Sequence, residues 1–221
     1  VKRLNVIIFA AGLGKRMNSS LPKVLHSLAG KSLLSHVLDT ANSLFPHRIC
    51  VVYGHGNDAV RDAIGNDELI WVKQEPQLGT GHALLQALPQ LDKKGLTLVL
   101  YGDVPLISFE TLQKLISASL KERLALLTMR LDEPAGYGRI VRDTESNNII
   151  AIVEDKDTNK DQQKIKEINT GIMLIPNANL HEWLPKLQNK NSQKEYYLTD
   201  IVAIAAKALS LIHISEPTRR S

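Results

Sequence analysis

The sequence predicts an α/β protein built on a doubly wound, mostly parallel sheet. Short apolar runs typical of buried strands alternate with segments of helical periodicity. Glycine-containing polar motifs directly follow several of these runs. In open sheets of this kind, ligands bind at the carboxyl ends of the strands. The 221 residues are 43% hydrophobic and 23% charged, an ordinary composition for one sizeable domain.

The elements follow in order along the chain. The run Val6-Ile-Ile-Phe-Ala10 predicts a first strand at residues 5–10. Further strands are expected at 49–53, 69–73, 97–101, 125–131 and 168–175, and a hairpin-like pair at 138–142 and 148–154. Helical spacing predicts helices at 32–44, 82–91 and 108–120, with Ser32 suited to cap the first. The chain has no internal repeat, low-complexity tract or evident linker.

Composition argues against several classes of protein. The net charge of +4 is small, and the basic residues form no stripe with interleaved aromatics, so no nucleic-acid partner is expected. The single Cys50 lies in an apolar run, which indicates a buried hydrophobe and a reducing compartment. No apolar run approaches the ~18 residues that span a membrane, and no signal-peptide pattern is present, so we expect a cytoplasmic protein. The histidines lack metal-ligand spacing; structural or solvent-facing roles are expected for His26, His36, His55 and His82.

The last thirteen residues do not read as native protein. The segment 209–221, Leu-Ser-Leu-Ile-His-Ile-Ser-Glu-Pro-Thr-Arg-Arg-Ser, resembles the in-frame translation of a transposase-type sequencing adapter joined to a truncated gene. We therefore expect a catalytic domain at residues 1–208, shortened at its C-terminal end, followed by a non-native tail at 209–221. Native coding sequence through this point of the locus would contradict the hypothesis.

The first strand leads into a loop suited to a polyphosphate. The stretch Phe9-Ala-Ala-Gly-Leu-Gly-Lys-Arg-Met17 precedes Leu21-Pro-Lys-Val-Leu25. Gly12 and Gly14 let the backbone approach an anion. Three cations would surround that anion: Lys15 and Arg16 in the first stretch and Lys23 in the second. A surface turn with scattered basic residues is the alternative, which the clustering disfavours. The spacing fits neither a Walker A loop nor the dinucleotide fingerprint.

A second motif places a carboxylate at the same edge of the sheet. In Leu98-Val-Leu-Tyr-Gly-Asp-Val-Pro-Leu106 a buried strand ends in Gly102 and Asp103. An aspartate there can bind Mg²⁺, the usual companion of nucleoside triphosphates, and Gly102 leaves room for a ligand. The alternative is an Asx cap, but the phosphate loop favours the metal site.

A third motif, Gln74-Glu-Pro-Gln-Leu-Gly-Thr-Gly-His-Ala83, combines an amide with a helix start. Gln74 can present a donor and an acceptor to the edge of a base. The segment Gly79-Thr-Gly81 opens a helix whose backbone amides we expect to be available to a polar ligand. Taken alone, it could be only a helix start.

A fourth group offers side chains suited to a sugar. It consists of Gly136-Tyr-Gly-Arg139, Val153-Glu-Asp-Lys156 and Glu167-Ile-Asn-Thr-Gly171. Carboxylate and amide groups suit hydroxyl and acetamido groups, whereas the alternative is a hairpin and turn satisfied internally. The segment Tyr196-Tyr-Leu-Thr-Asp200 follows, and the helical spacing of residues 200–208 predicts a last helix that Thr199 or Asp200 could cap.

Together these motifs identify a family. The first loop resembles the signature loop of the sugar nucleotidyltransferases. The whole ordered series covers nearly all of residues 5–208 and resembles the uridyltransferase domain of the bacterial bifunctional N-acetylglucosamine-1-phosphate uridyltransferase / glucosamine-1-phosphate acetyltransferases. The resemblance implies a Rossmann-like nucleotide-diphospho-sugar transferase fold. It also implies a cytoplasmic, Mg²⁺-dependent enzyme that makes UDP-N-acetylglucosamine and pyrophosphate from UTP and N-acetylglucosamine-1-phosphate, for peptidoglycan and lipopolysaccharide synthesis.

The resemblance also implies roles for individual residues. Catalysis would rest on Arg16, Lys23 and Asp103, with Asp103 as metal ligand, and Arg16→Ala is expected to lower turnover sharply. Substrate would be bound by Phe9, Ala10, Ala11, Gly12, Lys23, Gln74, Gly79, Thr80, Tyr101, Gly102, Asp103, Gly138, Glu154, Asn169 and Thr199. Two departures are Lys15, where the family commonly has Thr or Ser, and Phe9, where Leu is usual. A second metal ligand, an Asn, and the left-handed β-helix acetyltransferase domain are not found in the sequence.

Other interpretations remain open at this point. One is a related thymidylyl- or cytidylyltransferase, and another is a module that binds nucleotide sugars without turnover. The intact family is expected to be trimeric through the acetyltransferase domain, and this chain to be monomeric. Neither a nucleic acid nor a membrane is an expected partner.

Overall fold

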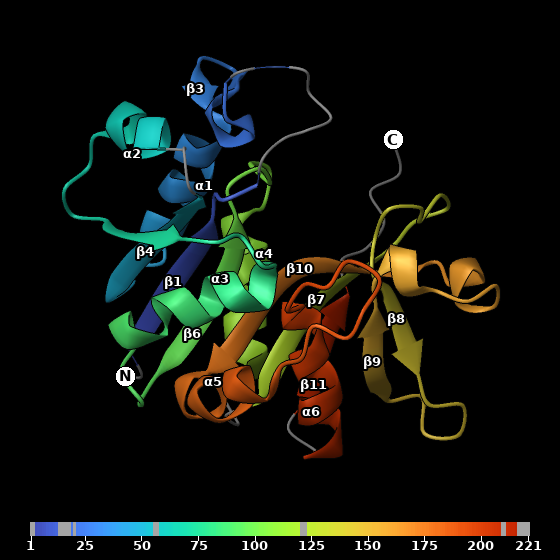
Figure 1. The fold of residues 1–221 in the computed structure, drawn as a ribbon. Helices are drawn as coiled ribbons and strands as arrows, with labels where there is room; N and C mark the ends of the chain where they lie inside the picture. Colours follow the sequence, from blue (N-terminus) through green and yellow to red (C-terminus); the bar gives the residue numbers. More distant parts are fainter. Residues whose placement is uncertain are drawn as a thin grey trace.

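The structure, a computed structural model, describes residues 3–12, 19, 21–54, 58–119, 123–208 and 211–215. At its centre lies a sheet of nine described strands with helices on both faces (Figure 1). The predicted fold class, a doubly wound α/β sheet, is confirmed.

The elements have the following bounds. The strands are β1 (Leu4–Phe9), β2 (Ser27–Leu28), β3 (Lys31–Ser32), β4 (Arg48–Gly54), β5 (Ile70–Gln74), β6 (Leu96–Tyr101), β7 (Leu124–Arg130), β8 (Arg139–Arg142), β9 (Ile149–Val153), β10 (Glu167–Pro176) and β11 (Leu211–Ser215). The α-helices are α1 (Leu33–Asn42), α2 (Asp58–Ile64), α3 (Thr80–Ala87), α4 (Phe109–Ala118), α5 (Asn177–Trp183) and α6 (Ile201–Lys207). The 3-10 turns are η2 (Lys23–Leu25), η3 (Leu88–Gln90), η5 (Asp155–Asp157), η6 (Gln162–Lys164), η7 (Leu184–Lys186) and η8 (Leu198–Asp200).

The order of the strands creates a crevice at one edge of the sheet. The main row is β11-β7-β10-β6-β1-β4-β5, in which only β10 runs against the others. After β1 the chain builds β4 and β5 on one side and then crosses to β6 on the other. The carboxyl ends of β1 and β6 therefore meet at a topological switch point, where such sheets bind ligands. The hairpin β8–β9 continues from β10 and stands away from the row (Figure 1).

Alternating side chains of the strands form a core on each face of the sheet. On β1, Val6 and Ile8 pack in a cluster with residues of α1, α2 and α4. Ile7 and Phe9 point the other way and pack with residues of α3, α5 and α6. This period of two is expected of a strand buried on both faces, and it explains why residues 6–9 of β1 are all apolar; Asn5, also buried, is the polar exception.

Several local predictions are confirmed and others are wrong. The Ser32 hydroxyl caps α1 by accepting the Ser35 N–H at 3.1 Å. Cys50 is fully buried, and burial raises its pKa to about 11. The proposed cap of α6 is wrong, because neither side chain caps it: Asp200 makes no capping bond, and the Thr199 hydroxyl donates to Glu154.

The sequence did not predict α2 and α5. Each has only seven residues. Such a segment spans about two turns, too few to show helical periodicity clearly. Among the described residues, no helix is both long enough and apolar enough to cross a membrane.

Residues 211–215 form β11, a parallel edge strand on β7. They belong to the segment expected to derive from an adapter. The pairing with β7 shows where these residues lie. It does not test their origin or the expected domain boundary at residue 208, and both stay predictions.

Candidate active site

A cavity of about 450 Å³ lies at the carboxyl ends of β1, β5 and β6, where the topology predicts a ligand. It joins the first three sequence motifs in one place. Its lining residues are Phe9, Ala11, Gly12, Lys23, Val24, Gln74, Gln77, Gly79, Thr80, Ala83, Tyr101, Asp103 and Glu195.

A cation and a carboxylate face each other in this cavity. Lys23 Nζ lies 2.6 Å from Asp103 Oδ2, and both side chains are partly exposed. Val24, in the same 3-10 turn as Lys23, is buried, which fixes the turn against the sheet. Asp103 makes no described side-chain bond to its own backbone, so the Asx cap considered from the sequence is not what holds it. Arg16, Lys15 and Gly14 lie outside the described residues.

Gly102 has a packing role that was not predicted. A Cβ added there would lie 3.1 Å from Val24 Cγ1 and 3.2 Å from Leu34 Cδ1. The missing side chain therefore lets η2 approach β6, which brings Lys23 to Asp103; on the side where a Cβ would point, the space is filled by protein. Ala10 is also buried, and neither residue lines the cavity.

The start of α3 is held by the segment 195–198. Gly79 has φ +99°, and a Cβ there would lie 2.7 Å from the Tyr196 carbonyl oxygen, so the close approach needs glycine. The Gly81 N–H donates to that carbonyl at 2.7 Å, and the Leu198 N–H donates to Thr80 Oγ1 at 3.0 Å. The prediction that the amides of Gly79-Thr-Gly81 are available to a ligand is thus wrong for Gly81.

Gln74 is held by the same region. It is 2% exposed, and its Nε2 lies 3.0 Å from the Gly79 carbonyl oxygen and 3.2 Å from His82 Nδ1. The amide predicted to face a base therefore lies on the cavity wall in a fixed orientation.

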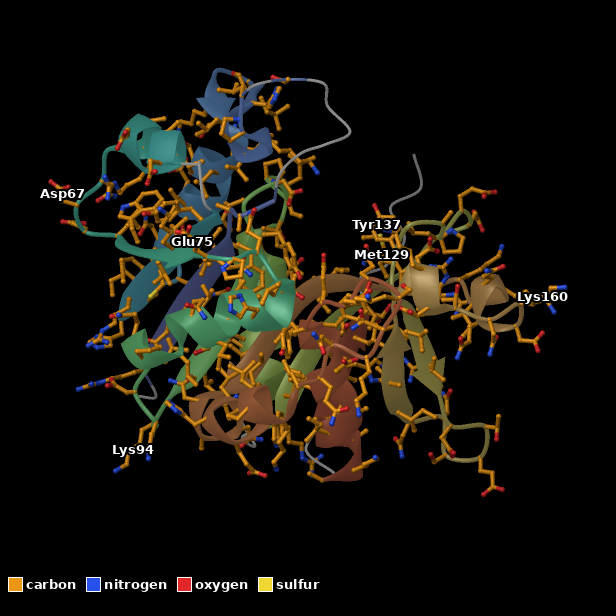
Figure 2. All side chains as sticks on the ribbon, in the orientation of Figure 1. Asp67, Glu75, Lys94, Met129, Tyr137 and Lys160 are labelled. Carbon is orange, nitrogen blue, oxygen red and sulfur yellow. The ribbon has the colours of Figure 1, made fainter. Side chains whose placement is uncertain are left out.

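A second cavity, of about 280 Å³, adjoins the first and shares Thr80, Tyr101 and Glu195 with it. It brings together the four residues that the resemblance assigns to a sugar, which are Gly138, Glu154, Asn169 and Thr199. In Figure 2, Tyr137, which lines this cavity, lies to the right of the centre of the view, and Glu75, which follows β5, lies to the left.

Glu154 is a partly buried carboxylate with a neutral partner. Thr199 Oγ1 donates to Glu154 Oε1 at 2.8 Å. Burial raises the pKa of Glu154; the Thr199 hydrogen bond opposes the shift, and Asp200, Asp157 and Asp155 add to it. Such a carboxylate gains from a ligand that donates hydrogen bonds to it.

Asn169 lies at an irregularity in β10. The β10–β7 register shifts between Asn169 and Met173, and Gly171 has φ +85°. The Gly171 N–H donates to Asn169 Oδ1 at 3.0 Å, which leaves Nδ2 without a described partner. The bulge therefore turns an amide donor toward the second cavity.

Tyr101 separates the two cavities. Its ring meets Phe9 edge-on, with centroids 5.5 Å apart, and packs so closely on Gly171 that a Cβ there would lie 2.5 Å from Tyr101 Cε2. Burial raises the pKa of its hydroxyl, as do the charges of Glu154 and Asp103. Tyr101 therefore contributes an uncharged ring and hydroxyl to the lining of both cavities.

The sequence did not single out several lining residues. Gln77 donates from Nε2 to the Ala11 carbonyl and so ties the third motif to the first loop. Gln77, Val24, Ala83 and Gly171 belong to motifs quoted from the sequence, but no role was assigned to them. Glu195 directly precedes the quoted segment 196–200 and was not singled out. No group of three or more His, Cys, Asp or Glu suited to a metal occurs among the described residues.

Comparison with known proteins identifies the family. A model of the MobA-like NTP transferase domain matches residues 6–164. The chain belongs to this family. It is 62% identical over 207 residues to the bifunctional protein GlmU of Nitrosospira multiformis, covering 94% of this chain and 45% of the relative. It is 59% identical over 216 residues to GlmU of Nitrosomonas europaea, covering 97% and 47%. The chain thus spans about half the length of these relatives, and the resemblance noted from the motifs is confirmed.

Solved structures agree at the level of the fold. An apo UDP-glucose pyrophosphorylase superposes with a TM-score of 0.79 at 17% identity, over 96% of this chain and 90% of that one. A putative glucose-1-phosphate thymidylyltransferase from Bacillus anthracis gives 0.73 at 18% identity, over 97% and 87%. The nucleotidyltransferase fold is therefore shown.

Proposed function

We propose that the chain is a sugar-1-phosphate nucleotidyltransferase domain that joins UTP to N-acetylglucosamine-1-phosphate. The observation that carries this is the adjoining pair of cavities that share Thr80, Tyr101 and Glu195. One holds the cation, the carboxylate and the amide suited to a nucleoside triphosphate. The other holds a carboxylate and an amide suited to a sugar. The high identity to GlmU proteins supports the choice of substrates.

In the proposed reaction an oxygen of the sugar phosphate attacks the α-phosphorus of UTP. The bond from that phosphorus to the bridging oxygen breaks, and pyrophosphate leaves. The attacking phosphate is already an anion, so no general base is required. The main obstacle is repulsion between two anions, which Lys23 offsets at the cavity and which Arg16 is expected to offset from the first loop.

The residues present fit a magnesium ion. Mg²⁺ typically takes one or two carboxylates and completes its shell with phosphate oxygens and water. Asp103 offers one carboxylate in the cavity, and its Oδ1 has no described partner. When bound there, the ion would offset negative charge on the triphosphate and on the departing pyrophosphate.

The sugar half of the proposal can be tested by calorimetry. The chain should bind UDP-N-acetylglucosamine at least about tenfold more tightly than UDP-glucose, because only the former carries an acetamido group for a site of buried polar groups such as Asn169. Equal affinities would contradict the choice of sugar. Failure of a cooperatively folding chain to bind either ligand would contradict the nucleotide-sugar site itself.

A further inference from the structure

His82 lies behind the cavity wall and was expected to have only a structural or solvent-facing role. It does not line the cavity, but its ring contacts two amide side chains. Nδ1 lies 3.2 Å from Gln74 Nε2, and Nε2 lies 3.1 Å from Gln86 Nε2. The Tyr196 ring lies alongside, with centroids 6.4 Å apart.

The hydrogen-bonding roles in this chain of groups follow from one fixed acceptor. The Gly79 carbonyl can only accept, so the atom of Gln74 that lies 3.0 Å from it must be the nitrogen. The same nitrogen faces His82 Nδ1, which must therefore accept and carry no proton. A neutral imidazole then has its proton on Nε2. Because an amide nitrogen cannot accept that proton, the Gln86 amide must be turned over, so that its oxygen rather than Nε2 faces the ring. Burial lowers the pKa of His82, in keeping with a neutral ring.

This arrangement uses both hydrogens of the Gln74 amide within the protein. No described residue donates to Oε1, which is therefore the part of the amide left for a ligand in the first cavity. Without His82, one of the two hydrogen bonds that orient Gln74 Nε2 would be lost. The amide would then be freer to turn over and present its nitrogen to the cavity as a donor.

We propose that His82 is a specificity-determining positioning residue, which restricts Gln74 to accepting a hydrogen bond from the ring N–H of a uracil-type base. Cytosine carries an acceptor nitrogen in place of that N–H. This nitrogen would face Gln74 Oε1, and since neither atom can donate, no hydrogen bond would form. A site built around one hydrogen bond rejects a ligand that cannot make it, because a buried polar group is left unsatisfied. This inference rests on the proposed nucleotide site and adds the means of choosing the base.

The test compares affinities for UTP, CTP and N3-methyl-UTP, which lacks the ring N–H, in magnesium buffer by calorimetry. The unmodified chain should prefer UTP to both of the others by about tenfold or more. His82→Leu should reduce the preference for UTP over CTP severalfold. His82→Asn, which places an acceptor oxygen near the position of Nδ1, should keep most of it. An unchanged preference in His82→Leu would overturn the proposal.

A second measurement does not depend on the variants folding. Long-range ¹H–¹⁵N NMR of the unmodified chain reports which nitrogen of His82 carries the proton. A proton on Nε2 alone is expected, and a proton on Nδ1 would overturn the assignment. If the chain binds no nucleotide at all, the proposed function fails and the inference about the base fails with it, whereas the NMR result still decides the tautomer of His82. If it binds UTP and CTP equally, only the inference about the base fails.

Discussion

Lys23 and Asp103 form an ion pair in the first cavity. We expect this pair to matter for ligand binding and catalysis rather than for the stability of the fold. Both side chains are partly exposed, and such pairs contribute little to folding, about 1 kcal/mol or less. Their placement instead depends on buried neighbours, namely Val24 and the close approach that Gly102 allows.

Lys23→Met should therefore lower turnover by about a hundredfold, the cost of removing one transition-state charge contact, and leave unfolding nearly unchanged. Lys31→Met is a matched control, because Lys31 also pairs with an aspartate, Asp39 at 2.7 Å, on exposed surface. Steady-state kinetics and urea unfolding of both variants check this. Equal turnover in the two variants would remove Lys23 from the catalytic role.

Glu154→Gln should change stability and binding in opposite directions. The pKa of Glu154 is raised in the folded state, so its ionised form is disfavoured there, and stability is lost as pH rises from the unfolded pKa through the folded one. Replacing the charge should stabilise the protein near about pH 7 and much less near about pH 4. It should also weaken the binding of UDP-N-acetylglucosamine by about tenfold or more.

Urea unfolding at the two pH values and calorimetry with the ligand check this prediction. A variant that is less stable at neutral pH, or that binds the ligand as tightly, would show that Glu154 is not a partly buried charge that binds the sugar.

At the level of elements, the loop 195–198 and the start of α3 form one unit. Three contacts tie them together: the Gly81 and Leu198 hydrogen bonds, and the Gly79 backbone beside Tyr196. Because Glu195 in this loop lines both cavities, the loop must hold its position for the two to adjoin.

Gly79→Ala tests that unit. The positive φ alone should cost about 1 kcal/mol of unfolding free energy, and Gly30→Ala, at φ +83° with no atom within 4 Å of the added Cβ, measures this cost. Gly79→Ala should cost roughly 1–3 kcal/mol more, the usual cost of overpacking, because the loop must move. Equal losses in the two variants, measured by chemical unfolding, would mean that the loop is not held there.

Sequence patterns predicted most strands of the sheet but not the tertiary contacts of several site residues. Long apolar runs such as Val6–Ala10 predicted the strands, and glycine and polar residues after them predicted where the site lies. Whether Gly102 or Gly81 faces a ligand or a neighbouring segment depends on tertiary contacts with Val24, Leu34 and Tyr196, which lie far away in the sequence. His82 was set aside for the same reason, since its partners are fixed only by the fold.

For the whole molecule, β11 closes one edge of the sheet. Leu211 packs with the cluster on one face of the sheet and Ile214 with the cluster on the other, and Arg142 Nη2 lies 3.0 Å from His213 Nε2. A chain ending at Ala208 should therefore lose about 1–3 kcal/mol of unfolding free energy through lost apolar burial. A chain ending at Ser215 keeps β11 and is the control. Equal stability of the two in urea would show that β11 does not stabilise the fold, whatever its origin.

Pyrophosphate release by the purified chain with UTP, N-acetylglucosamine-1-phosphate and Mg²⁺ decides the proposed function, with CTP and dTTP compared in place of UTP. Under this function, release requires the sugar phosphate and is greatest with UTP. A cooperatively folded chain that releases no pyrophosphate with any of these nucleotides, and that does not bind UDP-N-acetylglucosamine, would contradict it.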